Sequence, residues 1–228
     1  MKKTAIVSIL ATAASANAAT VMITPTAATY TNSPNQEETG YPLANENNII
    51  NGSGLSAAPT VANVATVTHD AVLLSGSGNA WATIDTGAGG GDFYAQGGNA
   101  PVFTFNLGGS YSVTDFAIWG YHFNGNNANH PKNITLEFSM NGGGSFGTPV
   151  NIVVPNAGAF NSADVVNFSA QTADFVRMTV TDNYFGSYAG GDRVGIAEVR
   201  FMGDAVPEPG VTLLGAIGSL ALLGRRRR

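Results

Sequence analysis

One short segment has the residue pattern of a catalytic nucleophile. Gly143-Gly144-Ser145-Phe146-Gly147 matches the G-x-S-x-G sequence of serine hydrolases. That sequence performs nucleophilic chemistry where a strand turns sharply into a helix and so presents the serine hydroxyl. Here the serine follows Asn141-Gly142, a dipeptide typical of β-hairpin turns, and no helical pattern comes after it. We therefore predict a loop serine and not a nucleophile.

The carboxylates and histidines of the chain are scattered. Glycoside hydrolysis needs a pair of carboxylates, and no motif joins the acidic residues. A zinc site needs several histidines in one shell, and their separations match no known ligand spacing. The residues considered are Asp85, Asp92, Glu137, Asp164, Asp182, His69, His122 and His130. We expect this protein not to be an enzyme.

Two stretches, residues 121–130 and 182–193, combine aromatic rings, imidazoles, amides and charges. A sugar ring has an apolar C–H face that lies on an aromatic ring, while polar side chains satisfy its hydroxyls. We predict that these stretches form ligand-binding loops. The predicted ligand residues are Trp81, His122, Asn124, His130, Asn183, Tyr184 and Arg193.

Several of these residues have a structural alternative. For either His122 or His130 taken alone, the favoured interpretation is a loop residue whose ring hydrogen-bonds to the neighbouring backbone. Tyr184 and Phe185 are alternatively plugs that cover one end of the fold. For Trp119 we predict core burial.

The composition excludes other classes of protein. A net charge of −5 and only 11% charged residues leave no basic stripe outside the C-terminal tail, so nucleic acid is not an expected partner. The chain has no cysteine, which excludes disulfides and thiol redox chemistry. With 44% hydrophobic residues and 29 glycines, the chain has enough apolar material for a core and many turns. This composition is typical of an extracellular all-β protein.

The elements that must position the loops are strands, because apolar residues alternate with polar ones. Residues 102–107, 115–121, 134–140, 150–154, 175–180 and 196–202 are predicted as strands, with Asn141-Gly142 as the turn between the third and the fourth. In 115–121 both faces are apolar, as expected inside a sandwich. Residues 31–98 are predicted to form long loops with a few short strands. One domain spanning residues 19–204 is the expected organisation.

The N-terminus carries a predicted signal peptide over residues 1–18. Lys2 and Lys3 precede an apolar stretch at residues 4–14, and Ala16-Asn17-Ala18 is a small-residue cleavage pattern. The alternative is an uncleaved amphipathic helix, although the segment lacks a polar face.

The C-terminus, residues 205–228, has three parts in a fixed order. The motif Val206, Pro207, Glu208, Pro209, Gly210 precedes an apolar run over 211–223, predicted to be a short helix, and then the block Arg225, Arg226, Arg227, Arg228. At ~1.5 Å per residue, the roughly 13 apolar residues span about 20 Å of a hydrocarbon core of about 30 Å. Four arginines stop export and hold the segment in the inner membrane. The alternative is an ordinary short membrane anchor.

This tail resembles the PEP-CTERM sorting signal. The resemblance implies recognition by exosortase, a membrane cysteine protease, together with the secretion machinery. It also implies removal of the tail after transient insertion in the inner membrane, and delivery to the cell surface or extracellular matrix of a Gram-negative bacterium.

The domain itself resembles discoidin-type, galactose-binding-like domains, which include coagulation-factor C-type domains and family 32 carbohydrate-binding modules. The stretches that carry the resemblance are Tyr41-Pro42-Leu43 with residues 48–55, Leu107-Gly108 with 115–120, residues 137–143, and residues 175–184 with 195–201. The resemblance implies an all-β, antiparallel jelly-roll β-sandwich with binding loops clustered at one end.

Many members of that family hold a structural calcium ion between an early loop and the last strand. Carried over by position, the resemblance implies Asn48 and Ala197 as backbone ligands, and Asn51, Ser53, Ser56 and Glu198 as side-chain ligands. Asn51 replaces an aspartate common in the family, so Glu198 is the one obvious carboxylate. The alternative is that Asn51-Gly52 is a plain turn and that Glu198 is solvated or paired with Arg200 or Arg177.

The sequence thus predicts an exported, exosortase-sorted, non-catalytic protein with a carbohydrate-binding module for a surface or exopolysaccharide ligand. The alternative is a structural protein of the biofilm matrix that has no specific sugar ligand.

Overall fold

The computed structural model describes residues 19–31, 45–70, 79–85, 91–122, 128–155 and 161–207. Its elements are β1 (Val21–Ile23), β2 (Ala27–Tyr30), the 3-10 helix η2 (Glu46–Ile49), β3 (Trp81–Ala82), β4 (Val102–Gly120), β5 (Pro131–Ser139), β6 (Val150–Val153), β7 (Ala163–Asn183) and β8 (Gly195–Ala205). Every pair of these strands is antiparallel. The predicted fold class, an all-β antiparallel jelly-roll β-sandwich, is confirmed.

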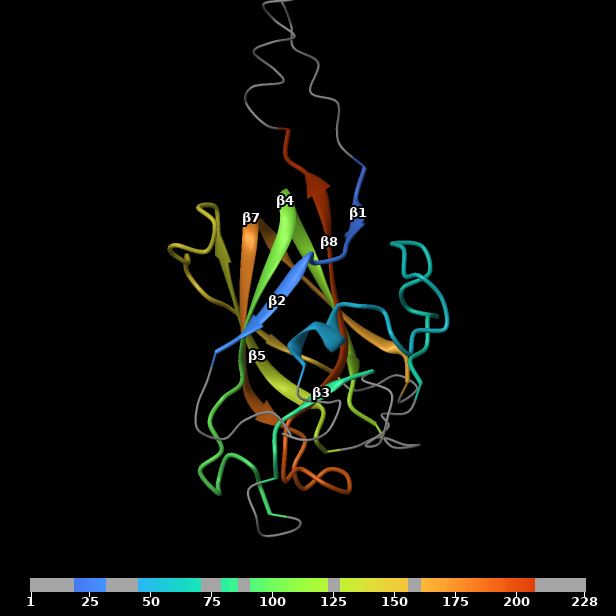
Figure 1. Ribbon diagram of the computed structural model, residues 1–228, viewed down its shortest axis with the longest axis vertical. Coiled ribbons are helices and arrows are strands. Elements are labelled where there is room, and N and C mark those ends of the chain that lie inside the picture. The colour runs from blue at the N-terminus through green and yellow to red at the C-terminus, as the bar shows by residue number, and fades with distance from the viewer. Residues whose placement is uncertain are drawn as a thin grey trace, which may run out of the picture.

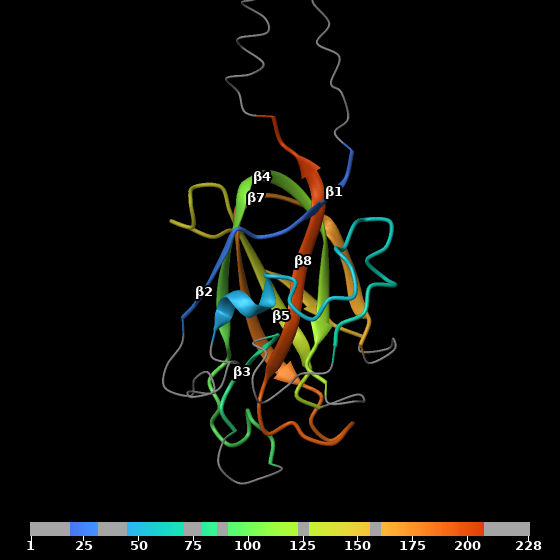
Figure 2. The same ribbon diagram turned by 45° about the vertical axis from the view of Figure 1, so that its right-hand side comes forward.

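Two long strands build both layers of the sandwich. The first part of β4, Val102 to Asn106, pairs with β2 and with the later part of β7, whereas the part from Tyr111 to Trp119 pairs with β8 and with the earlier part of β7. The register shifts between Asn106 and Tyr111, where Gly108 has a φ of 75° that side chains rarely adopt. The two strands therefore leave one layer and enter the other, and they arch over the top of the molecule (Figure 1, Figure 2).

This arrangement corrects the predicted strands in one respect. Residues 102–107 and 115–121 were expected as two separate strands, and the structure joins them in β4. Likewise, predicted strand 175–180 is the later part of the 21-residue strand β7. The predicted pairing of the two hairpin strands is confirmed, because Leu136 of β5 pairs with Val150 of β6. The predicted two-residue turn at Asn141-Gly142 is wrong, since β5 ends at Ser139 and β6 begins at Val150, so residues 140–149 join the strands.

The core lies between the layers and is rich in aromatic rings. Phe105 from the first part of β4 lies 5.6 Å from Phe201 of β8, which in turn lies 5.6 Å from Phe116 in the later part of β4. All three rings are fully buried. Burying each such side chain contributes about 1.5–3 kcal/mol, so this cluster holds the two layers together.

The outer face of the β8 layer is also covered. Ala117, Trp119 and Tyr121 point away from the main core and pack with Val64 and Val67 of the loop over 51–70. The indole Nε1 of Trp119 donates to the carbonyl of Val67 at 2.8 Å. The predicted burial of both faces of residues 115–121, and of Trp119 in particular, is therefore confirmed.

The described termini meet at one end of the sandwich. Thr20 Oγ1 donates to Asp204 Oδ1 at 2.8 Å, and the Val206 amide donates to the carbonyl of Ser110 at 2.9 Å. Residues 1–18, predicted as a signal peptide, and residues 208–228, with the apolar run and the arginines, lie outside the described residues. In the described part of the chain, no helix is long and apolar enough to span a membrane.

Candidate functional site

Four segments meet at the end of the sandwich opposite these termini, at the bottom of Figure 1. They are residues 79–85, 91–101, 128–130 and 184–194, and we call them the loop end. Backbone hydrogen bonds join them: Phe93 N–H donates to Gly191 O at 2.8 Å, and Tyr184 N–H donates to Ala128 O at 3.0 Å. Rigid strands commonly present recognition residues from such loops.

Asn183 organises the longest of these segments. Its Nδ2 donates to the carbonyls of Gly191 and Arg193 at 2.9 and 3.0 Å, and its Oδ1 accepts from the Phe185 amide at 3.1 Å. The residue is 2% exposed. Asn183 therefore shapes the loop from inside, and its predicted role as a ligand contact is corrected.

Tyr184 fills the space beneath that loop. The His130 ring stacks on it at a centroid distance of 6.0 Å, and the Lys132 ammonium lies 5.9 Å from its centroid. Its hydroxyl donates to the carbonyl of Val154, and burial raises the pKa of this hydroxyl. The plug alternative therefore describes Tyr184 better than a sugar platform does.

His130 is buried as well, so its predicted ligand contact is also corrected. Its Nε2 lies 3.4 Å from Asp164 Oδ2. A Cβ on Gly120 would lie 1.8 Å from the His130 Nδ1, so only glycine at position 120 lets this ring pack against β4.

The exposed aromatic faces at the loop end belong to two neighbours of Tyr184. Phe185 is 43% exposed and Tyr188 is 38% exposed, and a β-bridge joins their backbones. The Tyr188 ring meets that of Tyr184 in a T-shaped contact, with 6.1 Å between the ring centroids. The sequence predicted this loop as a binding loop but did not predict Tyr188 as a ligand residue. Alternating Tyr and Gly residues do not indicate which ring faces solvent.

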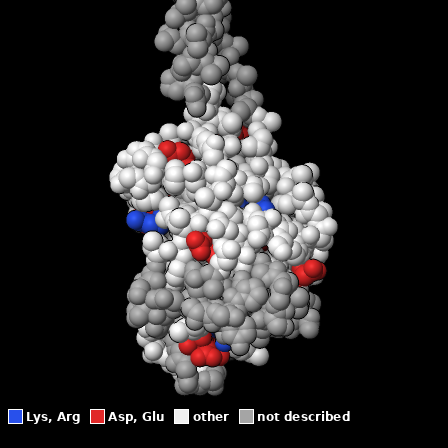
Figure 3. Space-filling view, in the orientation of Figure 1, with Lys and Arg blue, Asp and Glu red and all other residues white. Residues whose placement is uncertain are grey.

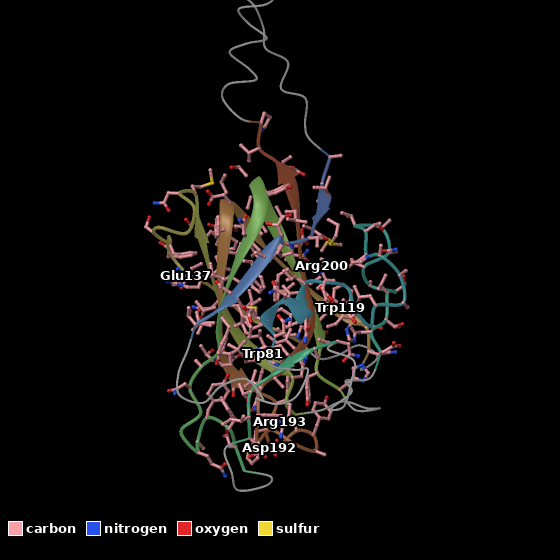
Figure 4. All side chains as sticks on the ribbon, in the orientation of Figure 1. Trp81, Trp119, Glu137, Asp192, Arg193 and Arg200 are labelled. Carbon is pink, nitrogen blue, oxygen red and sulfur yellow. The ribbon has the colours of Figure 1, made fainter. Side chains whose placement is uncertain are left out.

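The loop end also carries charged groups, and Gly191, which precedes Asp192 in the chain, lies next to Phe185. Arg193 Nη2 is 3.5 Å from Asp85 Oδ2, and Arg193 Nε is 4.0 Å from Asp192 Oδ1. Figure 4 labels Asp192 and Arg193 at the bottom of the molecule, where Figure 3 shows acidic atoms next to a basic one. Carboxylates accept and a guanidinium donates, which is the pairing that sugar hydroxyls require.

Trp81 and His122 are not available to a ligand. Trp81 is 0% exposed and packs in the core against Tyr30 at 5.0 Å and Phe103 at 4.7 Å (Figure 4). The buried His122 ring places Nε2 3.2 Å from the carbonyl of His69, and burial lowers the pKa of both imidazoles. Both predicted ligand contacts are corrected, since neither ring has an exposed face. Asn124, also predicted, lies outside the described residues.

The residues of the expected calcium site lie near one another, but several of their side-chain oxygens already accept hydrogen bonds. Asn51 Oδ1 accepts from the Ser53 amide at 2.7 Å, as in a plain Asx turn, and Ser56 Oγ accepts from the Thr68 amide at 3.0 Å. Asn48 is buried and donates to the carbonyl of Ala80 at 2.8 Å. Ala197 is the extra residue of a β-bulge opposite Trp119 and Gly120, a feature that the alternating pattern does not reveal.

The one carboxylate of that set is neutralised by the protein. Glu198 is 0% exposed; its Oε1 pairs with Arg200 Nη1, and its Oε2 accepts from the Gly52 amide at 2.8 Å. A calcium ion would need the Glu198 carboxylate as a ligand, but the Arg200 guanidinium already pairs with it. The described residues contain no group of three or more histidine, cysteine, aspartate and glutamate side chains that could hold a metal ion. The arrangement does not fit calcium.

The hydrolase-like segment lies in the loop between β5 and β6. Ser145 Oγ accepts from Asn141 Nδ2 at 2.9 Å, and the chain continues into β6. The predicted hairpin context of Ser145 is therefore confirmed.

No protein-family model matches the sequence, and no curated protein matches it. Among solved structures, the chain is similar to the family 32 carbohydrate-binding module of Clostridium perfringens NanJ in complex with galactose, with 16% identity, a TM-score of 0.45, and coverage of 81% of this chain and 99% of that one. It is also similar to the C-terminal domain of a Bacteroides fragilis chitobiase, with 13% identity, a TM-score of 0.48, and coverage of 82% and 99%. The likeness concerns the fold and does not say which residues meet a ligand.

Proposed function

We propose that this chain is an exported, non-catalytic protein whose β-sandwich binds carbohydrate through the loop end. The observation that carries the proposal is that the loop end holds both the exposed pair Phe185 and Tyr188 and the charged group of Arg193, Asp85 and Asp192. Aromatic faces with a few convergent polar groups are the usual composition of a sugar site.

The proposal includes sorting by exosortase to the cell surface or extracellular matrix. Its support is the sequence of the two ends, with a secretory signal before residue 19 and the Pro-Glu-Pro motif, apolar run and arginines after residue 205. The ends of the described chain lie opposite the loop end (Figure 1). A chain held by its C-terminus would therefore point the loop end away from the membrane.

A structural matrix role without a specific sugar ligand is the second candidate. It is favoured by the contacts of Tyr184, whose ring is covered by His130 and Lys132 and therefore serves packing. Under this candidate, the exposed rings would contact other matrix components or remain in solvent.

Titration of a panel of neutral oligosaccharides against Tyr188→Ala separates the two candidates. We expect the best-bound sugar to lose affinity by about 10–30-fold, the effect of removing an aromatic anchor worth about 2 kcal/mol. The matched control is Phe146→Ala at the far end of the sandwich, where the Arg177 guanidinium lies 4.3 Å from the ring centroid. Equal affinities of both variants and the unmodified protein would favour the structural role.

A further inference from the structure

A concave site lies on the flank of the sandwich, away from the loop end. Its volume is about 370 Å³, and its lining includes Thr24, Asn51, Leu55, Ala58, Pro59 and Arg200. Figure 4 labels Arg200 on this flank, well above Asp192 and Arg193. The site is therefore distinct from the loop end.

Arg200 is the charged residue of the described lining. The residue is 3% exposed, and its Nη1 donates to Glu198 Oε1 and to the carbonyl of Val199. Its buried Nε has no hydrogen-bond partner among the described residues. Nη2, the atom that would lie 3.6 Å from a Cβ on the pocket residue Gly52, has no partner there either. Nε and Nη2 form one edge of the guanidinium, and this edge is the fork that holds a carboxylate with two parallel hydrogen bonds.

The rest of the lining matches a ligand that is charged on one side and apolar on another. Thr24 and Asn51 add a hydroxyl and an amide, and the described lining includes no aspartate or glutamate. Leu55, Ala58 and Pro59 supply an apolar wall. Glu198 lies buried beneath Arg200, where it holds the guanidinium in place but does not face the pocket lining.

We propose that this pocket binds the carboxylate of an acidic sugar residue, a uronate. The carboxylate meets Arg200, and the C–H face of the sugar ring lies against the wall of Leu55 and Pro59. The inference deepens the proposed carbohydrate-binding function, on which it rests, by adding a second subsite and a class of polymer. It also places an anion, not a cation, at the loop where calcium was expected.

Calorimetric titration of the purified full-length chain tests the site with three probes: trigalacturonate, its carboxyl-reduced counterpart and sodium acetate. We expect trigalacturonate to bind at least about tenfold more tightly than either other probe, a difference of about 1.4 kcal/mol. Equal affinity for the reduced sugar would overturn the charge argument. Equal affinity for acetate would show a site for free carboxylates and overturn the uronate assignment.

Ala58 offers a matched pair of variants, because it is exposed on the pocket wall and its substitution leaves the buried ion pair intact. Ala58→Asp places a negative charge at the site and is expected to weaken trigalacturonate binding at least about tenfold by like-charge repulsion. In Ala58→Asn the new side chain is nearly the same size as that in Ala58→Asp but has no charge. Its affinity for trigalacturonate is therefore expected to stay within about threefold of that of the unmodified protein. Equal losses in both variants would overturn the proposal.

The loop-end variant Tyr188→Ala separates this inference from the proposed function. If Ala58→Asp abolishes trigalacturonate binding and Tyr188→Ala leaves it unchanged, the pocket is supported, whether or not the loop end binds neutral sugars. If Tyr188→Ala abolishes trigalacturonate binding and Ala58→Asp leaves it unchanged, the acidic sugar binds at the loop end and the pocket proposal is overturned.

Discussion

Glu198 and Arg200 are charged residues in an interior that almost excludes water, and their pairing decides how the loop at Asn51 is held. Burial raises the pKa of Glu198 from 4.5 to about 7, even though Arg200 and the Gly52 amide favour the charged form. Removing one partner of a buried ion pair leaves an uncompensated charge, which costs about 3–5 kcal/mol. The pair thus joins β8 to the early loop through the Gly52 amide.

This pKa gives a pH dependence with a definite sign. Between pH 4.5 and about 7, folded Glu198 retains a proton that the unfolded chain has lost, so the free energy of unfolding decreases as pH rises through this window. We expect the stability of the unmodified protein, relative to that of Glu198→Gln, to fall between pH 4.5 and 7 in urea unfolding experiments. The buried His69 and His122, whose pKa values are lowered, act in the opposite direction but equally in both proteins. A pH-independent difference would contradict this account.

The same pair predicts that calcium has no structural role. We expect neither millimolar calcium nor a chelator to change the Tm of the protein, because Arg200 already neutralises the Glu198 carboxylate. A reproducible rise in Tm with calcium that chelation reverses would show that the ion displaces Arg200.

Trp81 tests the correction of the predicted site. Because the ring is buried against Tyr30 and Phe103, Trp81→Ala is expected to cost about 3–5 kcal/mol of stability, and Trp81→Phe less. Sugar affinity measured on the folded fraction should not change. If Trp81→Ala kept its stability and lost sugar binding, Trp81 would be a ligand residue after all.

At the scale of elements, β8 passes very close to the later part of β4. A Cβ on Gly203 would lie 2.2 Å from the carbonyl oxygen of Ser112 and 2.8 Å from the Val113 Cα, and backbone atoms in a ladder cannot move aside. Only glycine therefore lets β8 pair with β4 and β1 at this point.

We expect Gly203→Ala to lose about 3 kcal/mol or more, as overpacking does when the neighbours are backbone. The control is Gly147→Ala, whose added Cβ would meet nothing closer than 3.6 Å and should change stability by less than about 0.5 kcal/mol. Urea unfolding of both variants measures the difference. Similar midpoints would mean that the two strands can separate at low cost.

The alternating pattern predicted the buried faces well but not the length of the strands. Phe103, Phe105 and Leu107 are buried as the alternation required. The joining of 102–107 and 115–121 in one strand depends on Gly108 and on pairing with β7 far along the chain, which local patterns do not contain. Strands β1 and β2 were missed because three or four residues are too few to show a period.

For the site, sequence chemistry located the loop but not the orientation of its side chains. Tyr184 and Tyr188 are the same residue type in one segment, yet one is stacked under His130 and the other faces solvent. Tertiary hydrogen bonds decide this difference. Tyr184 bonds to Ala128 and Val154, which are distant in the chain, and Asn183 bonds to Gly191 across the loop. The pocket at Arg200 was missed for the same reason.

At the scale of the whole molecule, the two described ends share one pole and the loop end occupies the other (Figure 2). This polarity is what a surface-displayed binding protein needs, provided that both terminal segments are processed. We expect the intact mass of the protein from the host cell surface to correspond to a chain that begins near Ala19 and lacks Arg225, Arg226, Arg227 and Arg228. Finding the four arginines on the surface protein would contradict sorting by exosortase.

Carbohydrate binding at the loop end is tested by exposing the purified chain to a broad array of glycans and bacterial exopolysaccharides, with Tyr188→Ala and Phe146→Ala measured in parallel. We expect selective binding that is lost in Tyr188→Ala and retained in Phe146→Ala. A folded protein that binds no glycan on the array, or binds equally well without Tyr188, would contradict this expectation.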